Sequence, residues 1–167
     1  MTSGADHEVR LELGACAEAT ERIGRWVGEH LSAGTTVALT GPLGAGKTTF
    51  VRGLARGLQV EDPDEVHSPT YLLVVEHPGP VPLLHADAYL PEKLEAFLED
   101  GGLEYLLDSA KVVCVEWAEN VRNALPSNTL WVELGHAAGG GRWLRMHAGP
   151  YEQFSWLAEC PRMTEPD

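Results

Sequence analysis

The sequence has little positive charge. Its 167 residues include 12 Lys and Arg against 25 Asp and Glu, which gives a formal net charge of −13. Tight binding to the phosphate backbone of a nucleic acid depends largely on clustered Lys and Arg. We therefore do not expect the chain to hold RNA or DNA by itself, and any nucleic acid must be bound by a partner.

Cysteines and long apolar runs are also scarce. Cys16, Cys114 and Cys160 lie far apart and form no CxxC pair, which favours reduced thiols over disulfides or a zinc site. No apolar run approaches the roughly 18 residues that a membrane helix requires. Residues 1–10 contain no basic start followed by an apolar stretch. We expect a cytoplasmic protein that does not enter a membrane.

Helical and strand patterns alternate along the chain, which indicates an α/β fold. The length suits one domain over residues 1–167, with short flexible ends at about 1–7 and 161–167. The expected strands are 9–13, 35–40, 71–76, 81–86, 112–115, 129–134 and 142–147. The expected helices are 17–31, 47–58, 91–98, 103–107 and 151–160. The breakers between 76 and 81 predict that strands 71–76 and 81–86 form a hairpin.

Residues 41–48, GPLGAGKT, match the phosphate-binding pattern GxxxxGK[ST] at every required position. The motif lies between a predicted strand and a predicted helix, as its chemistry demands. Gly41, Gly44 and Gly46 would let backbone N–H groups turn inward around a phosphate. Lys47 would reach the β- and γ-phosphate oxygens, and the hydroxyl of Thr48 would bind magnesium. The positive end of the following helix dipole would face the same anion.

A P-loop needs a second acidic group for magnesium, usually at the end of a neighbouring apolar strand. Glu116 ends the segment VVCVE, and Asp87 ends LLHAD. Both remain candidates: Glu116 could hold the metal while Asp87 orders a water or senses the γ-phosphate. His85 lies on the same strand face as Asp87, and we expect it to pack or to make a structural hydrogen bond, since no second histidine completes a metal site.

Residues 68–71, SPTY, follow an acidic loop and carry several hydroxyl groups. They lie where a loop ordered by the γ-phosphate and magnesium would switch, although a plain turn entering a strand is equally compatible with the spacing. We take Thr70 as the candidate from this segment. The predicted catalytic residues are thus Lys47, Asp87, Glu116 and Thr70.

The segments GPLGAGKTTF, SPTY, HADAY, PEKLE, VEW and the late GR resemble the TsaE (YjeE) family in order and spacing, over nearly the whole chain. The resemblance implies a P-loop ATPase with a mixed central sheet flanked by helices. It implies ATP and Mg²⁺ as cofactors and TsaD-like and TsaB-like proteins as partners, with tRNA contacted only through them. The implied role is the threonylcarbamoyl modification of the tRNA adenosine beside the anticodon.

The resemblance also implies roles for individual residues. Thr48 and Glu116 would hold magnesium, and Asp87 would lie near the γ-phosphate. The residues expected to contact the nucleotide are Gly41, Gly44, Ala45, Gly46, Lys47, Thr48, Thr49, Asp87, Ala17, Thr20, Trp117 and Arg142. The chain departs from the family at Leu90, where the family usually has arginine, and at Cys16, where a serine or threonine N-cap is common.

Three other readings use the same P-loop. A small-molecule kinase would need a lid with several arginines, and the stretch 91–108 contains Lys93 as its one cation. A GTP-dependent switch would carry an NKxD-like base-reading tetrapeptide, which is absent from the sequence after the P-loop. A non-hydrolysing scaffold, in which ATP fixes a partner surface, is compatible with Leu90 in place of arginine.

Overall fold

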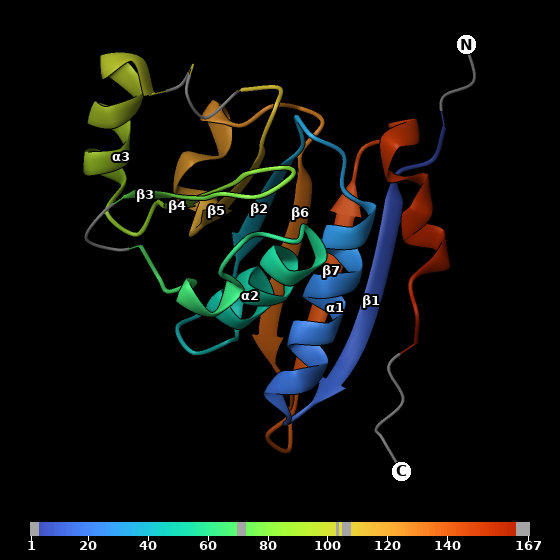
Figure 1. Cartoon of the computed structure of the whole chain (residues 1–167). Helices are drawn as coiled ribbons and strands as arrows, with labels where there is room; N and C mark the ends of the chain where they lie inside the picture. Colours follow the sequence, from blue (N-terminus) through green and yellow to red (C-terminus); the bar gives the residue numbers. More distant parts are fainter. Residues whose placement is uncertain (1–3, 70–72, 103, 105–107, 163–167) are drawn as a thin grey trace.

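A seven-stranded sheet forms the centre of the computed structural model, which describes residues 4–69, 73–102, 104 and 108–162 (Figure 1). The strand order is β1-β7-β6-β2-β5-β4-β3. The strands are β1 (His7–Gly14), β2 (Thr36–Thr40), β3 (Val74–His77), β4 (Leu83–Asp87), β5 (Val112–Glu116), β6 (Leu130–His136) and β7 (Arg142–Ala148). The helices and helical turns are α1 (Ala17–His30), α2 (Lys47–Gly57), η1 (Pro63–Glu65), α3 (Pro91–Phe97), η2 (Leu98–Gly102), η3 (Ala118–Ala124) and η4 (Glu152–Glu159).

The sheet is mixed. β4, β5, β2 and β6 run parallel to one another, whereas β3 pairs antiparallel with β4, β7 with β6, and β1 with β7. This confirms the predicted α/β fold, and the antiparallel pairing of β3 with β4 confirms the predicted hairpin. Because four neighbouring strands point the same way, their carboxyl ends meet at one edge, where open α/β sheets usually bind ligands.

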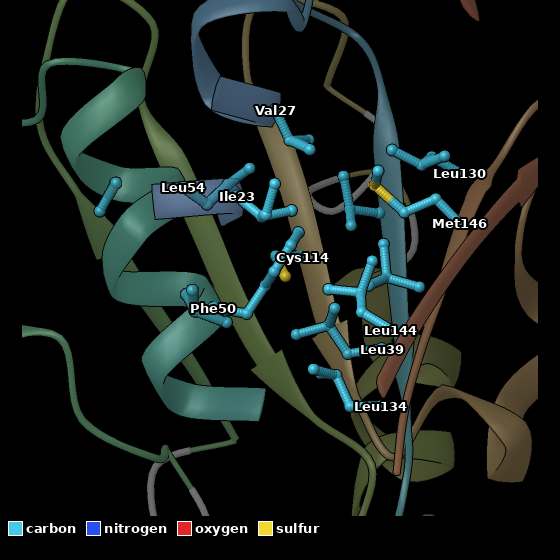
Figure 2. Packing of buried hydrophobic residues seen from close by; sticks show 14 of the residues in the cluster. Ile23, Val27, Leu39, Phe50, Leu54, Cys114, Leu130, Leu134, Leu144 and Met146 are labelled. Carbon is cyan, nitrogen blue, oxygen red and sulfur yellow. The ribbon is translucent and has the colours of Figure 1, made fainter. Parts of the chain in front are cut away.

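Helices α1 and α2 lie side by side across one face of the sheet (Figure 1). Apolar side chains alternate along each strand, so that Leu39 of β2 points toward these helices while Ala38 points to the opposite face. Figure 2 shows the resulting core, in which Phe50 and Leu54 of α2 meet sheet residues including Leu39. Burial of this apolar face is the main force that fixes α2, and with it the P-loop, against the sheet.

Glycines allow α1 and α2 to approach closely. Gly24 and Gly28 of α1 and Gly53 and Gly57 of α2 all lie at the crossing, and a Cβ on any of them would come within 2.4 Å of a backbone oxygen of the other helix. At Gly53 the oxygen is that of Glu21, only 2.1 Å away. The spacing of four residues puts each pair on one helix face. This close helix contact was not predicted from the sequence.

The opposite sheet face is covered over β2, β5 and β4 by a second apolar cluster, to which α3 contributes Leu94 and η3 contributes Val121. The predicted helix 91–98 forms as α3 followed by a π-helical turn. The predicted helix 151–160 forms as the 3₁₀ helix η4 rather than as an α-helix. The predicted helix 103–107 and the start of strand 71–76 lie largely outside the described residues. Within the described ranges, no helix has both the length and the apolar character needed to cross a membrane.

Candidate functional site

The carboxyl edge of the parallel strands brings the P-loop together with both candidate carboxylates. Residues 41–48 follow directly after β2, Glu116 ends β5, and Asp87 ends β4. Leu39 pairs with Glu116 in register, and Glu116 pairs with Asp87. The two acids that the sequence offered as alternatives are therefore neighbours on the same sheet face.

Antiparallel strands bring two further elements to the same edge. β7 begins at Arg142 beside the carboxyl end of β6, and Gly14 at the end of β1 pairs with Arg142. Helix α1 therefore starts near the P-loop, with Ala17 exposed and Thr20 buried. Thr20 lies beside Gly46, and its buried Oγ1 has no hydrogen-bond partner among the described residues.

The P-loop has the backbone conformation that its glycines allow. Gly46 has φ of 105° in the left-handed region and is the N-cap of α2. Gly41 has φ of 143°, and a Cβ there would lie 2.3 Å from the oxygen of Leu134. The first α2 hydrogen bond joins Phe50 N to Gly46 O at 2.9 Å. The backbone N–H groups before Phe50 therefore precede the helical ladder and can face an anion.

Lys47 is held by groups of the loop itself. Its Nζ donates to the backbone oxygens of Gly41 at 2.5 Å and Pro42 at 3.0 Å, and it lies 3.9 Å from the centre of the Trp117 ring. Trp117 has φ of 57°, a left-handed conformation that turns the chain sharply after Glu116. Burial lowers the pKa of the Lys47 ammonium, while the charges of nearby carboxylates, Glu116 foremost, oppose that shift.

Thr48, Glu116 and His85 form a chain of hydrogen bonds beneath the loop. Thr48 Oγ1 donates to Glu116 Oε1 at 3.1 Å, and His85 Nε2 lies 2.6 Å from Glu116 Oε2. Glu116 is 2% exposed and His85 is fully buried. A hydroxyl and one carboxylate suit Mg²⁺, which prefers oxygen ligands and usually keeps waters and substrate phosphates as the others. The described residues contain no cluster of three or more His, Cys, Asp or Glu that could hold a metal alone.

Asp87 is fixed from two sides. Its Oδ1 accepts the backbone N–H of Tyr89 at 2.7 Å, and its Oδ2 accepts the hydroxyl of Ser68 at 3.2 Å. The carboxylate is 2% exposed. Ser68 belongs to the SPTY segment, whereas Thr70, the residue predicted from it, lies outside the described residues.

A pocket of about 470 Å³ opens at this edge, within the range of roughly 300 to 1,000 Å³ that small-molecule sites occupy. Its lining residues are Leu43, Gly44, Gly46, Lys47, Thr48, Thr49, Ser68, Tyr89, Glu116, Trp117 and Arg142. Eight of these were predicted from the sequence. Gly41, Ala45, Ala17, Thr20 and Asp87 were also predicted but do not line the pocket.

Leu43, Ser68 and Tyr89 were not singled out from the sequence, although they line the pocket. Each lies within a segment that the sequence did mark: Leu43 in the P-loop, Ser68 in SPTY and Tyr89 in HADAY. Tyr89 contacts the Trp117 ring at 5.2 Å between centroids. The motifs therefore include these three residues, but which of their side chains point into the pocket depends on the tertiary structure.

Residues 15–143 match the sequence model of a family described as threonylcarbamoyl adenosine biosynthesis protein TsaE. The chain is 40% identical over 126 residues to the tRNA threonylcarbamoyladenosine biosynthesis protein TsaE of Treponema pallidum, covering 75% of this chain and 91% of that protein. It is 35% identical to the protein of the same name from Bacillus subtilis, covering 75% and 77%. The crystal structure of Bacillus subtilis YdiB superposes with a TM-score of 0.72 at 26% identity and covers 94% of this chain and 95% of that one.

Proposed function

The chain belongs to the TsaE family, and from this premise we propose that it binds and hydrolyses ATP with magnesium to support threonylcarbamoyl modification of tRNA. The observation that carries the proposal is the pocket at the carboxyl edge of the sheet, where Lys47, Thr48, Glu116 and Arg142 surround one space. These groups offer two cations and two oxygen ligands, which is what a magnesium–triphosphate complex requires.

The P-loop would bind the phosphates through its backbone. The N–H groups that precede Phe50 provide donors without a helical acceptor, and the positive end of the α2 dipole favours negative charge there. Lys47 would exchange its bonds to the oxygens of Gly41 and Pro42 for the β- and γ-phosphate oxygens. Arg142 would approach from the start of β7, and Trp117 would contact the nucleotide from the turn after β5.

Thr48 and Glu116 would hold magnesium, since their oxygens lie 3.1 Å apart at the base of the pocket. When bound, the ion neutralises charge on the β- and γ-phosphates. Asp87 would order the attacking water or sense the γ-phosphate through Ser68, its hydrogen-bond partner, which lines the pocket where Asp87 itself does not. Because Ser68 and the backbone of Tyr89 both donate to it, this carboxylate is held in one direction, as a water-positioning group should be. Thr70, two residues after Ser68, remains a candidate for the γ-phosphate side of the pocket.

The partners would be TsaD-like and TsaB-like proteins, and tRNA would be contacted only through them. With a net charge of −13, this chain is repelled by a phosphate backbone. Such a role would place the protein in the cytoplasm, where tRNA and ATP are available.

Reconstitution tests the proposal. Purified chain, TsaD and TsaB homologues, tRNA, an activated threonylcarbamoyl donor, ATP and magnesium should yield threonylcarbamoyladenosine over repeated cycles, together with inorganic phosphate. The Lys47→Ala variant should yield neither threonylcarbamoyladenosine nor phosphate while remaining folded, because the Lys47 side chain serves to bind the ligand and is not part of the hydrophobic core. Modification that continues without ATP turnover would support a non-hydrolysing scaffold instead. Transfer of the γ-phosphoryl group to a small acceptor would support a kinase.

A further inference from the structure

His85 has no access to solvent, yet it carries a polar ring into an apolar layer. It lies on β4 with its side chain on the face covered by α2, between Leu83 and Asp87 on the same strand face. Its neighbour in register on β5 is Cys114, which is also fully buried. Leu83 on the same strand and Cys114 on β5 both belong to the apolar core. Burying an imidazole here costs free energy unless a hydrogen bond offsets it.

That hydrogen bond goes to Glu116. His85 Nε2 lies 2.6 Å from Glu116 Oε2, and an ionised carboxylate can only accept, so Nε2 carries the proton and donates. The other ring nitrogen, Nδ1, is buried and has no hydrogen-bond partner among the described residues. Among the described residues, the hydrogen bonding of the ring is therefore directed at Glu116 alone. A residue that only packs in the core would not need the N–H donor at Nε2.

The two carboxylate oxygens of Glu116 therefore have different hydrogen-bond partners. Oε2 accepts from His85, and Oε1 accepts from Thr48. The imidazole comes from the side of β4 and the hydroxyl from α2, so together they fix the plane of the carboxylate. Without His85 the carboxylate could rotate and turn Oε1 away from Thr48.

We propose that His85 is a positioning residue, which holds the carboxylate of Glu116 by one oxygen so that the other is presented, beside Thr48, to the metal. The inference rests on the proposed function, because it assumes that Thr48 and Glu116 bind magnesium. His85 does not line the pocket, so it would contact neither nucleotide nor metal. Residues that hydrogen-bond to a metal ligand in this way typically contribute about 10- to 100-fold in metal affinity or activity.

Two variants test the hydrogen bond from His85 to Glu116 separately from the loss of the imidazole ring. In His85→Gln the amide nitrogen is as many bonds from Cβ as Nε2 is in histidine, so it can still donate to Glu116. In His85→Asn the amide nitrogen is one bond closer to Cβ, at the position that Nδ1 has in histidine, and cannot reach Glu116. Both variants keep a polar, uncharged group at the same buried position. The matched control is His77→Asn, which changes a buried histidine on β3 whose ring centre lies 6.4 Å from that of His85.

The experiment measures ADP and ATP affinity by calorimetry in EDTA and across a magnesium series. We expect all variants to bind nucleotide in EDTA as the wild type does. Magnesium should strengthen binding normally in the wild type, His85→Gln and His77→Asn, whereas His85→Asn should require about 10- to 100-fold more magnesium. In a Glu116→Gln background, His85→Asn should have no additional effect, because the carboxylate through which it acts is gone.

Equal magnesium dependence in His85→Gln and His85→Asn, whether normal or impaired, would overturn the inference. Unfolding of both variants would also overturn it, because His85 would then be required for the stability of the fold. An effect of His85→Asn that persists in the Glu116→Gln background would also overturn it. If instead magnesium does not strengthen nucleotide binding even in the wild type, the proposed metal site itself fails, and this result is distinguishable from the others.

Discussion

Replacing Gly53 by alanine tests the close crossing of α1 and α2. In an ordinary solvent-facing helix, Gly→Ala stabilises by about 1 kcal/mol, because alanine loses less backbone freedom on folding. In this structure the new Cβ would lie 2.1 Å from the backbone oxygen of Glu21 and 2.9 Å from the backbone nitrogen of Arg25. Both contacts are with main chain, so no side-chain rotation relieves them, and the helices must separate.

Overpacking of this kind costs about 1 to 3 kcal/mol. A contact with rigid backbone belongs at the upper end of that range, since the neighbouring helix moves only as a unit. Subtracting the gain in helix propensity leaves a net destabilisation of about 2 kcal/mol. For a domain of this size, that corresponds to a midpoint of thermal unfolding about 4 to 8 °C lower.

Urea unfolding followed by circular dichroism gives the free energy of unfolding directly. The control is Gly141→Ala, where the new Cβ would come no closer than 3.5 Å to any neighbour and the change should stay within about 0.5 kcal/mol. If Gly53→Ala stabilises the protein as an exposed helical site would, the helices do not cross through these glycines.

Three further predictions concern the site and the thiols. Asp87→Ala should lower ATP turnover with partners by about 100-fold and leave magnesium–ATP affinity nearly unchanged, as single-turnover and binding assays would reveal. Glu116→Ala should raise the magnesium concentration needed for tight ATP binding by at least about 10-fold, with little effect on binding in EDTA; if the two phenotypes are reversed, the two acids exchange roles. Reaction with a thiol reagent at pH 8 should modify exposed Cys16 first and Cys114 only after unfolding, because burial raises the pKa of the Cys114 thiol well above its usual value. Cys160, whose pKa is raised to about 11 by burial, should react slowly at pH 8 and faster as the pH rises toward that value.

The P-loop could be predicted because its information is local. Its glycines, lysine and threonine are fixed in spacing by one strand-to-helix turn, and the structure has that turn. The α/β class followed from the alternation of periodic segments in the same way. Whether Asp87 or Glu116 lies nearer the loop could not be decided locally, because it depends on β4 and β5 being adjacent and on the register that pairs the two acids.

The features that the sequence analysis missed depend on contacts between distant segments. Glycine within a helix pattern ordinarily weakens the helix, so Gly24 and Gly53 gave no sign of the crossing that they permit. The bond from Ser68 to Asp87 joins a loop to a strand end and follows from no periodicity. The interpretation of His85 as a residue with a structural hydrogen bond agrees with the structure, but its partner, Glu116, could be identified only from the paired strands.

Calorimetric titration of ATP into the purified chain, with and without magnesium, is the decisive test of nucleotide binding at the P-loop. We expect one site per chain, tighter binding with magnesium, and loss of binding in Lys47→Ala with the folded state intact. Equal affinity of Lys47→Ala and wild type for magnesium–ATP would contradict this expectation, because the phosphates would then be bound somewhere other than the loop at residues 41–48.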